Sequence, residues 1–364
     1  MTLKRVVQYS RIGTKLMMSR TKKETWPISV SFHVTKKCNL KCKHCYAVLD
    51  TIKEPELTIE QILSVIDELY NHGTLSIRLL GGEPLVRKEL PEIIKKVKSK
   101  GMFCELVTNG TLLRKRIGQW PELKKLDSVC VSLDGDKILH DSIRGKGTFN
   151  RTIDGMYALI ETGIPVRLHG ALAADSFADN HEPHKSLAQL SAKYRIPFNI
   201  ATYCPNPFKN SDDNANRESF KMSSQVYRDL LELKKKGVMI TTTKHILEKG
   251  VDWFNYTDKY ILYGHTDNLP PGHKLCQAGI TNCFINSDGG MYSCIPRWAK
   301  GLNVIHDGVK ESYEYMIKMR KIDNCLLCYN LAQWEYSSFF NFADPRLLFN
   351  MSKNIFRLLH HKRH

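Results

Sequence analysis

The sequence has no long apolar run. No segment approaches the roughly 18 consecutive apolar residues of a membrane-spanning helix, and the first twenty residues contain no apolar core of the kind that a secretion signal needs. Eleven cysteines are an odd number, and in a chain of 364 residues they disfavour a secreted disulfide framework. We therefore expect a cytoplasmic protein whose thiols are reduced and available to metal.

Acidic residues are missing from both ends. Residues 1–23 carry seven lysines and arginines, residues 346–364 carry five, and the whole chain has a net charge of +17. Apolar residues recur at helical spacing in both stretches, which predicts amphipathic helices. Such helices either pack on the body of the protein or lie peripherally on an anionic membrane surface, as at the inner membrane. Nucleic acid is disfavoured as a partner because no base-stacking motif accompanies the basic residues.

Between the ends, β-rich and amphipathic helical segments alternate. Strands are expected at 27–34, 75–80, 102–107, 127–133, 164–172 and 196–203, and helices at 58–73, 89–101 and 148–163. This alternation predicts a parallel sheet with helices on its outer face. Six units are too few to close an eight-stranded barrel. The predicted fold class is therefore α/β, an open partial (β/α)6 barrel followed by a small cysteine-rich module.

These patterns divide the chain into five predicted parts. They are a basic N-terminal helix (1–26), the partial barrel (27–205), a linker and helical bridge with a helix near 223–236 (206–269), a cysteine-rich module (270–330) and a basic amphipathic tail (331–364).

Three cysteines, Cys38, Cys42 and Cys45, follow the first predicted strand within eight positions. A structural metal centre closes its coordination with four protein ligands, whereas a catalytic centre keeps one position open. Either a fourth ligand lies far away or the open position is functional. The sequences GGEP (81–84), TNG (108–110) and SLDG (132–135) follow the next three strands, at the sheet edge where parallel α/β folds place their chemistry.

The C-x3-C-x2-C spacing together with GGEP resembles the radical S-adenosylmethionine (SAM) superfamily, whose fold is a six-unit partial barrel. The resemblance covers about residues 27–205. It implies a [4Fe-4S] cluster held by Cys38, Cys42 and Cys45, with the fourth iron left to chelate S-adenosyl-L-methionine. An electron passed to SAM from a donor such as flavodoxin or ferredoxin then generates a radical that abstracts hydrogen from substrate.

The resemblance also implies a set of residues that bind SAM. They are Gly81, Gly82, Glu83 and Pro84 at the amino group, His44 near the adenine, Ser132 and Asp134 at the ribose or substrate, Arg144 at the carboxylate, and Asn109 as a turn residue near the site. For Ser132 and Asp134 the alternative is a helix cap. For Arg144 the alternative is a surface residue.

A second cysteine group lies at Cys276, Cys294, Cys325 and Cys328, with Gly289 between the first two. It resembles the twitch module, the shortened relative of SPASM, which holds one auxiliary [4Fe-4S] cluster with four cysteines. Cys283 lies between Cys276 and Cys294 and is a further possible ligand. A structural zinc site is the alternative for this group.

The substrate is not fixed by these motifs, since function belongs to the site rather than the fold. Candidates for proton transfer near the barrel mouth are His169, Asp134 and Tyr203. We expect a lipid-linked or anionic small-molecule substrate. One alternative is a ribosomal-peptide maturase, although the residues before 27 are too few for a leader-binding domain. Another is a non-catalytic zinc or iron-sulfur module that binds nucleic acid.

Overall fold

The computed structural model describes residues 26–45, 54–172, 182–202, 213–257, 261–273, 275–297 and 301–329. Within these residues one eight-stranded sheet has the strand order β6-β5-β4-β3-β2-β1-β8-β9. Its strands are β1 (Ser29–His33), β2 (Ser76–Leu80), β3 (Phe103–Thr108), β4 (Ser128–Ser132), β5 (Val166–Leu172), β6 (Phe198–Thr202), β8 (Asn282–Ile285) and β9 (Met291–Tyr292). Strands β1 to β6 are parallel neighbours in chain order, so the predicted α/β partial barrel is confirmed.

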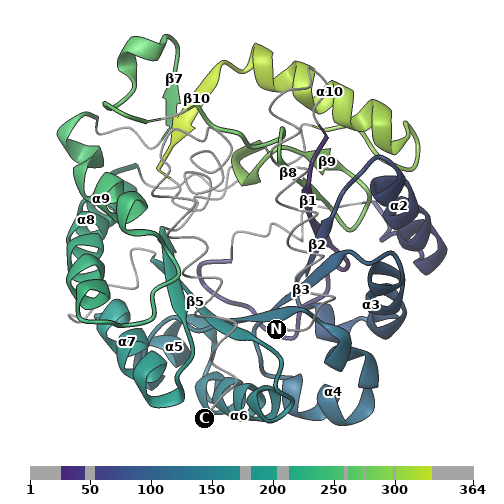
Figure 1. Cartoon of the computed structure of the whole chain (residues 1–364), viewed down its shortest axis with the longest axis horizontal. Coiled ribbons are helices and arrows are strands. Elements are labelled where there is room, and N and C mark those ends of the chain that lie inside the picture. The colour runs from purple at the N-terminus through teal and green to yellow at the C-terminus, as the bar shows by residue number, and fades with distance from the viewer. Residues whose placement is uncertain are drawn as a thin grey trace.

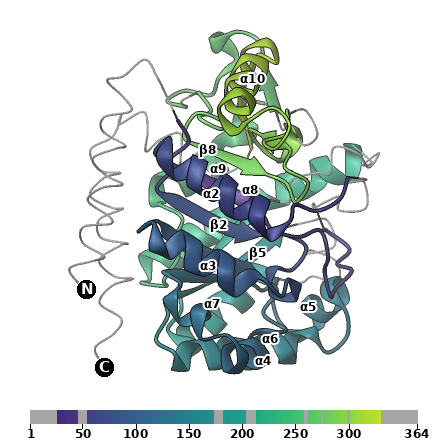
Figure 2. The same cartoon turned by 90° about the vertical axis from the view of Figure 1, so that its right-hand side faces the viewer.

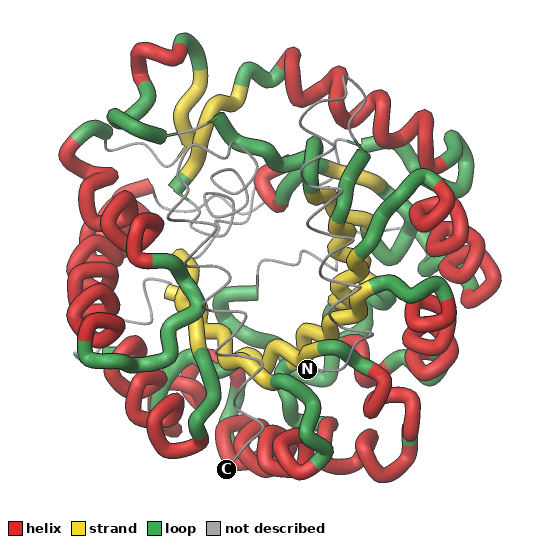
Figure 3. The backbone as a smooth tube through the Cα atoms, viewed as in Figure 1, coloured by secondary structure: helices red, strands yellow, loops and turns green. Residues whose placement is uncertain are grey.

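Helices form a layer around the outside of the curved sheet (Figures 1 and 3). They are α2 (Ile59–Asn71), α3 (Leu90–Ser99), α4 (Leu113–Gln119), α5 (Lys137–Arg144), α6 (Thr148–Glu161), α7 (Pro183–Tyr194), α8 (Asp213–Lys235), α9 (Lys244–Asp252) and α10 (Val309–Ile322). Local sequence sets several of their ends. In α2, Thr58 and Gln61 form a reciprocal capping box, and Gly73 follows the helix at a φ of 102° that favours glycine.

The hydrophobic core lies between the sheet and these helices. Val30 and Phe32 of β1 and Ile77 and Leu79 of β2 are fully buried there. The alternate side chains of each strand face the concave side, and many of these are only partly buried. The two faces of the sheet therefore differ: the outer face packs the core, and the concave face is polar and reaches solvent.

Strands β8 and β9 of the cysteine-rich segment continue the barrel sheet. Strand β8 pairs in parallel with β1, and β9 pairs antiparallel with β8. Helix α10 packs against α2 at this end of the molecule (Figure 2). A second ribbon pairs β7 (Ile261–Tyr263) with β10 (Cys325–Cys328). Strands on the two sides of the predicted boundary at residue 270 therefore hydrogen-bond to each other, β1 with β8 and β7 with β10. Pairing between segments so far apart in the sequence is not encoded in any local pattern.

One helix is longer than predicted, and several predictions fall outside the described residues. Helix α8 begins at Asp213, well before the expected 223, because an established helix extends through polar residues at little cost. The predicted basic segments 1–26, apart from Trp26, and 331–364 lie outside the described residues. In the part of the chain that is described, no helix is long and apolar enough to cross a membrane.

Candidate functional site

The loop that carries Cys38, Cys42 and Cys45 leaves the carboxyl end of β1. Cys38 and Cys45 are exposed and Cys42 is half-buried. The loop is fixed on both sides by backbone hydrogen bonds. The Glu83 N–H donates to the Lys37 carbonyl over 2.9 Å, and the Lys43 N–H donates to the Ile143 carbonyl at the end of α5 over 3.0 Å. The backbone around these thiols is therefore held by two neighbouring units of the barrel.

Gly81 and Gly82 allow the loop after β2 to lie directly against the cysteine loop. A Cβ on Gly81 would lie 2.5 Å from the Thr35 carbonyl oxygen, and one on Gly82 would lie 2.3 Å from that of Lys37 and 2.9 Å from the Cβ of Cys38. Because the two loops lie so close, the Gly82 N–H donates a hydrogen bond of 2.8 Å to the Thr35 carbonyl oxygen. Both positions require glycine because the two loops approach so closely. The Gly81–Gly82 part of GGEP therefore positions the cysteine loop.

The Glu83 carboxylate is turned into the protein. It is buried and accepts hydrogen bonds from the N–H of Leu85 at 3.0 Å, the N–H of Asn109 at 2.8 Å and the hydroxyl of Thr108 at 2.8 Å. Burial raises its pKa, and these hydrogen bonds oppose the rise. Pro84 begins the short 3-10 turn Pro84–Val86 that Glu83 caps. The side chain of Glu83 therefore joins the ends of β2 and β3, and the expected contact of GGEP with the SAM amino group stays a prediction.

Asn109 behaves as the turn residue that we expected, and it also holds the cysteine loop. The Asn109 side-chain Nδ2 donates to Asn39 Oδ1 at 3.0 Å, and the Thr111 hydroxyl donates to Asn109 Oδ1 at 2.6 Å. The Asn39 side-chain Nδ2 donates to the Thr111 hydroxyl oxygen at 2.9 Å. Sequence reasoning missed Asn39. Its position directly after Cys38 was the available signal.

Asp134 and Arg144 form an ion pair beneath the cysteine loop. Arg144 donates from Nε to one carboxylate oxygen at 2.5 Å and from Nη2 to the other at 3.2 Å. Asp134 is fully buried, yet the Arg144 guanidinium and His44 overcome the effect of that burial and hold the pKa of Asp134 well below its usual range. A carboxylate with so low a pKa is a poor proton acceptor near neutral pH, so Asp134 is not supported as a proton-transfer residue.

The same ion pair decides between the alternatives for Arg144 and involves His44. Arg144 is mostly buried, so the surface alternative is wrong, and its positive charge acts on the thiols of Cys42 and Cys45. The His44 imidazole faces Asp134, with Nε2 3.6 Å from a carboxylate oxygen. This contact links the cysteine loop to the end of β4, and the expected place of His44 near the adenine stays a prediction. Sequence reasoning missed His140, whose Nδ1 accepts from the Asp134 N–H at 3.3 Å.

Ser132 and His169 lie side by side on the concave face, where Ser132 of β4 is in register with His169 of β5. His169 pairs in turn with Asn199 of β6. Burial lowers the pKa of His169 to about 4, so its imidazole is neutral at pH 7. Tyr203, the third proton-transfer candidate, lies outside the described residues.

Two segments of the second cysteine group meet at β10. The Cys276 N–H donates to the Leu326 carbonyl at 2.8 Å, which brings Cys276 beside the Cys325–Cys328 strand. Burial raises the pKa of the Cys325 thiol to about 11, and Cys276 is close enough to add to that rise. Cys283, in contrast, is fully buried in the apolar core beside β1. Cys283 is therefore not placed to act as a ligand.

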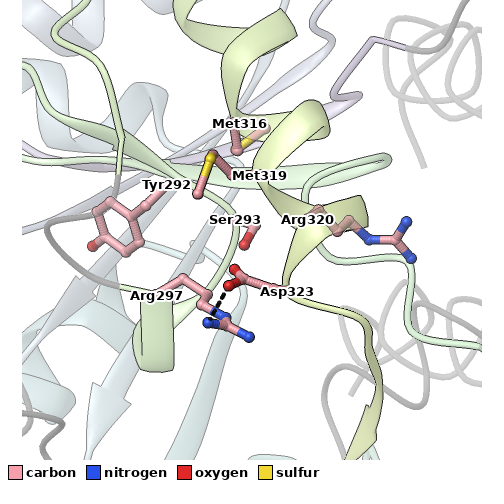
Figure 4. Close-up of a pocket in the computed structure, with 7 residues that line it drawn as sticks. All are labelled: Tyr292, Ser293, Arg297, Met316, Met319, Arg320 and Asp323. Carbon is pink, nitrogen blue, oxygen red and sulfur yellow. Dashed lines mark ion pairs between the residues drawn. The ribbon is translucent and has the colours of Figure 1, made fainter. Parts of the chain in front are cut away.

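Two arginines lie against this second group. Arg297, three residues after Cys294, pairs with Asp323 at 2.8 Å, and Arg320 of α10 donates to the Cys276 carbonyl. Figure 4 shows Arg297 and Asp323 facing each other across a small pocket that Met316 and Met319 of α10 also line. Among the described residues, no three His, Cys, Asp or Glu side chains are arranged to hold a single metal ion.

Comparison with known proteins identifies the barrel. Residues 32–174 match the sequence pattern of the Radical SAM superfamily. The chain carries a radical SAM domain. This domain begins in β1 and ends just past β5, so it includes the three-cysteine loop, GGEP, Asp134 and Arg144.

Named relatives of the radical SAM domain differ in function. The Fe-coproporphyrin III synthase of Methanosarcina barkeri is 36% identical over 177 residues, 48% of this chain and 44% of that protein. The antilisterial bacteriocin subtilosin biosynthesis protein AlbA of Bacillus subtilis is 33% identical over 170 residues, 46% of this chain and 38% of that protein. The matched part thus spans less than half of either relative.

A solved structure extends the likeness in fold beyond the radical SAM domain. "Native anSMEcpe with bound AdoMet" aligns with a TM-score of 0.59 and 19% identity over 90% of this chain and 100% of that one. At this identity the likeness is one of fold.

The residues of the radical SAM domain fit the [4Fe-4S] cluster and SAM that the superfamily implies. Thiolates are the ligands that bind such clusters, and two of the three thiols are exposed on a loop that the close approach of Gly81 and Gly82 holds in place. The Nδ1 atom of His44, between Cys42 and Cys45, is buried with no hydrogen-bond partner among the described residues. The loop therefore offers soft ligands and an unused polar atom together.

Proposed function

We propose that this protein is a radical SAM enzyme that cleaves SAM reductively and removes a hydrogen atom from an organic substrate. The observation that carries the proposal is the three-thiol loop, which is held from both sides by GGEP and by α5. When bound, the cluster and SAM supply the electron and the 5'-deoxyadenosyl radical.

The chain itself supplies positions and charge at this site. Cys38, Cys42 and Cys45 bind the cluster, and the backbone of Gly81 and Gly82 sets where the loop stands. Arg144, oriented by Asp134, places a guanidinium beside two of the thiols. A guanidinium suits a carboxylate ligand such as that of SAM, and it offsets part of the negative charge of a thiolate-bound cluster. Ser132 and His169 lie on the concave face, where a substrate would approach.

The second cysteine group is proposed to hold an auxiliary [4Fe-4S] cluster through Cys276, Cys294, Cys325 and Cys328. Four protein ligands leave no open position, so its role would be electron transfer or support. Arg297 and Arg320 supply positive charge nearby. A structural zinc site is the alternative for the same four cysteines.

The substrate class divides into two proposals. An anionic small molecule is the first. A peptide is the second, favoured by the name of the Bacillus subtilis relative, a bacteriocin biosynthesis protein. Flavodoxin or ferredoxin is the proposed electron donor. Contact with an anionic membrane stays a prediction, because both basic ends fall outside the described residues.

The experiment is anaerobic reconstitution with iron and sulfide, followed by measurement of 5'-deoxyadenosine released from SAM under dithionite. The wild type and Cys104→Ala, which changes a core thiol of β3, should both cleave SAM. The Cys38/Cys42/Cys45→Ala variant should not. An iron-loaded wild type that releases no 5'-deoxyadenosine would favour a non-catalytic module that binds nucleic acid or another partner.

A further inference from the structure

The three-cysteine loop carries a cluster of exposed lysines. Residues 34–45 contain four lysines and no aspartate or glutamate. Three of these lysines, Lys37, Lys41 and Lys43, alternate with the cysteines and are exposed. Lys146 is also exposed, on the turn after α5, close to where the Lys43 N–H donates to the end of that helix. We call Lys37, Lys41, Lys43 and Lys146 the lysine edge.

The charge of the lysine edge is not balanced by the acidic residues around it. Three acidic residues next to the loop each have a basic neighbour of their own: Asp134 has Arg144, Glu54 has Lys36 and Glu56 has Arg87. Among the described residues, no ion pair joins any of the four lysines of the edge. Residues 46–53, which lie outside the described residues, add one aspartate and one lysine and so no net charge. The exposed surface of the loop is therefore positive.

The loop does not need these lysine side chains for its own structure. Its position is set by backbone N–H groups on both sides and by the close approach of Gly81 and Gly82. An exposed charged side chain contributes little to stability even when it is paired. A group of exposed charges of one sign instead attracts partners of the opposite sign and speeds their association. The lysine edge thus has the character of a docking surface for an acidic partner.

We propose that the lysine edge docks an acidic electron-donor protein of the flavodoxin class. The inference rests on the proposed function, because that function consumes one electron for each SAM that is cleaved. Lys37 and Lys41 directly precede Cys38 and Cys42 in the sequence, so a protein bound to them has its redox centre close to the three thiols. The reduced flavin of the donor loses one electron and the cluster gains it, and no atom passes between the two proteins.

This role predicts a specific kinetic signature. Attraction between exposed charges acts on the encounter of two proteins more than on the steps that follow. Loss of lysine charge should therefore raise the flavodoxin concentration that gives half the maximal rate, and leave the maximal rate unchanged. The attraction should also weaken with salt, because the screening length falls from about 10 Å at 0.1 M to about 3 Å at 1 M. A substitution that only disturbed the loop would lower the maximal rate with every reductant.

The test compares two reductants on the reconstituted full-length protein. Release of 5'-deoxyadenosine from SAM is measured with saturating dithionite, a small reductant that needs no docking surface, and with a purified flavodoxin kept reduced by NADPH and flavodoxin reductase. At low ionic strength Lys41→Glu/Lys146→Glu should raise the KM for flavodoxin by about tenfold and keep the rate with dithionite. Lys41→Arg, which keeps the charge, should behave as the wild type.

Two further variants make the test decisive. Lys124→Glu is the matched control, because Lys124 is an exposed lysine of the 3-10 turn Pro121–Lys125, which precedes β4 at the opposite edge of the sheet. It should match the wild type with both reductants. Lys146→Glu alone changes no residue of the cysteine loop, so it should show a smaller rise in KM even if the double variant fails to load iron.

The outcomes separate this inference from the proposed function. An unchanged KM for flavodoxin in Lys41→Glu/Lys146→Glu and in Lys146→Glu would overturn the docking surface. So would a wild type that cleaves SAM with dithionite and not with flavodoxin. In both cases cleavage with dithionite leaves the proposed function standing. An iron-loaded wild type that releases no 5'-deoxyadenosine with dithionite would overturn the proposed function, and this inference with it.

Discussion

The two cysteine regions of this chain are built in opposite ways. Cys38, Cys42 and Cys45 lie on one short loop, and Cys38 and Cys45 are exposed. Cys276, Cys294, Cys325 and Cys328 come from three separate segments, which are the one before β8, the one after β9, and β10 itself. The cysteines of the first region are brought together by one positioned loop, whereas those of the second region depend on the packing of separate segments. Their contributions can therefore be separated by mutation.

Asp134→Asn should have the largest effect, and on the first region. It leaves the buried Arg144 guanidinium without its charged partner, which costs about 3–5 kcal/mol of unfolding free energy. Urea unfolding followed by circular dichroism measures the loss. A surface pair supplies the control: Asp154→Asn, opposite the exposed Arg114, should cost about 1 kcal/mol or less. Equal losses for both variants would contradict the buried ion pair.

Gly82→Ala should disturb the first region and spare the second. Its Cβ would lie 2.3 Å from the Lys37 carbonyl oxygen and push on Cys38, at a cost of about 1–3 kcal/mol. We expect it to lose about four irons per chain, one [4Fe-4S] cluster, together with SAM cleavage. Gly118→Ala, with nothing within 4 Å of its Cβ, should keep both. Iron analysis and 5'-deoxyadenosine release test the pair, and normal cleavage by Gly82→Ala would refute the packing argument.

Acid should lower the stability of the barrel that carries the first cysteine region. Glu105 of β3 pairs with Arg78 of β2 and Arg167 of β5. Burial opposes ionisation of Glu105, but the two guanidinium groups outweigh it and lower the pKa of Glu105 in the folded protein. Its contribution to stability is therefore complete above the unfolded pKa near 4.3 and is lost as pH falls further toward the folded pKa. Urea midpoints measured from pH 7 to pH 3 should therefore fall less steeply below pH 4 in Glu105→Gln than in the wild type. Parallel curves for the two proteins would argue against a charged, paired Glu105.

Cys283→Ala should have the smallest effect. Because Cys283 is a core side chain of β8, the change costs about 1 kcal/mol and removes no iron. Cys276→Ala, its matched partner from the same segment, should remove the auxiliary cluster iron while the first cluster stays. Loss of iron from Cys283→Ala would return Cys283 to the ligand set.

Sequence patterns predicted the local features of the fold, the positions of its strands and helices. The six strands lie within two residues of their expected ends, and helix α2 (Ile59–Asn71) lies within two residues of the expected 58–73. Long-range partners were not predictable. Nothing near Glu83 indicates that its carboxylate caps the turn between β2 and β3, and nothing near Cys283 shows that β8 pairs with β1. Charged residues inside apolar strands, as at Arg78 and Glu105, were a signal that sequence reasoning overlooked.

The most direct test of the two-region account is the iron content of three anaerobically reconstituted proteins: the wild type, Cys38/Cys42/Cys45→Ala and Cys276/Cys294/Cys325/Cys328→Ala. Two [4Fe-4S] clusters predict about eight, four and four irons per chain, with SAM cleavage abolished in the first variant. About four irons in the wild type, unchanged when Cys276, Cys294, Cys325 and Cys328 are replaced, would contradict a second cluster.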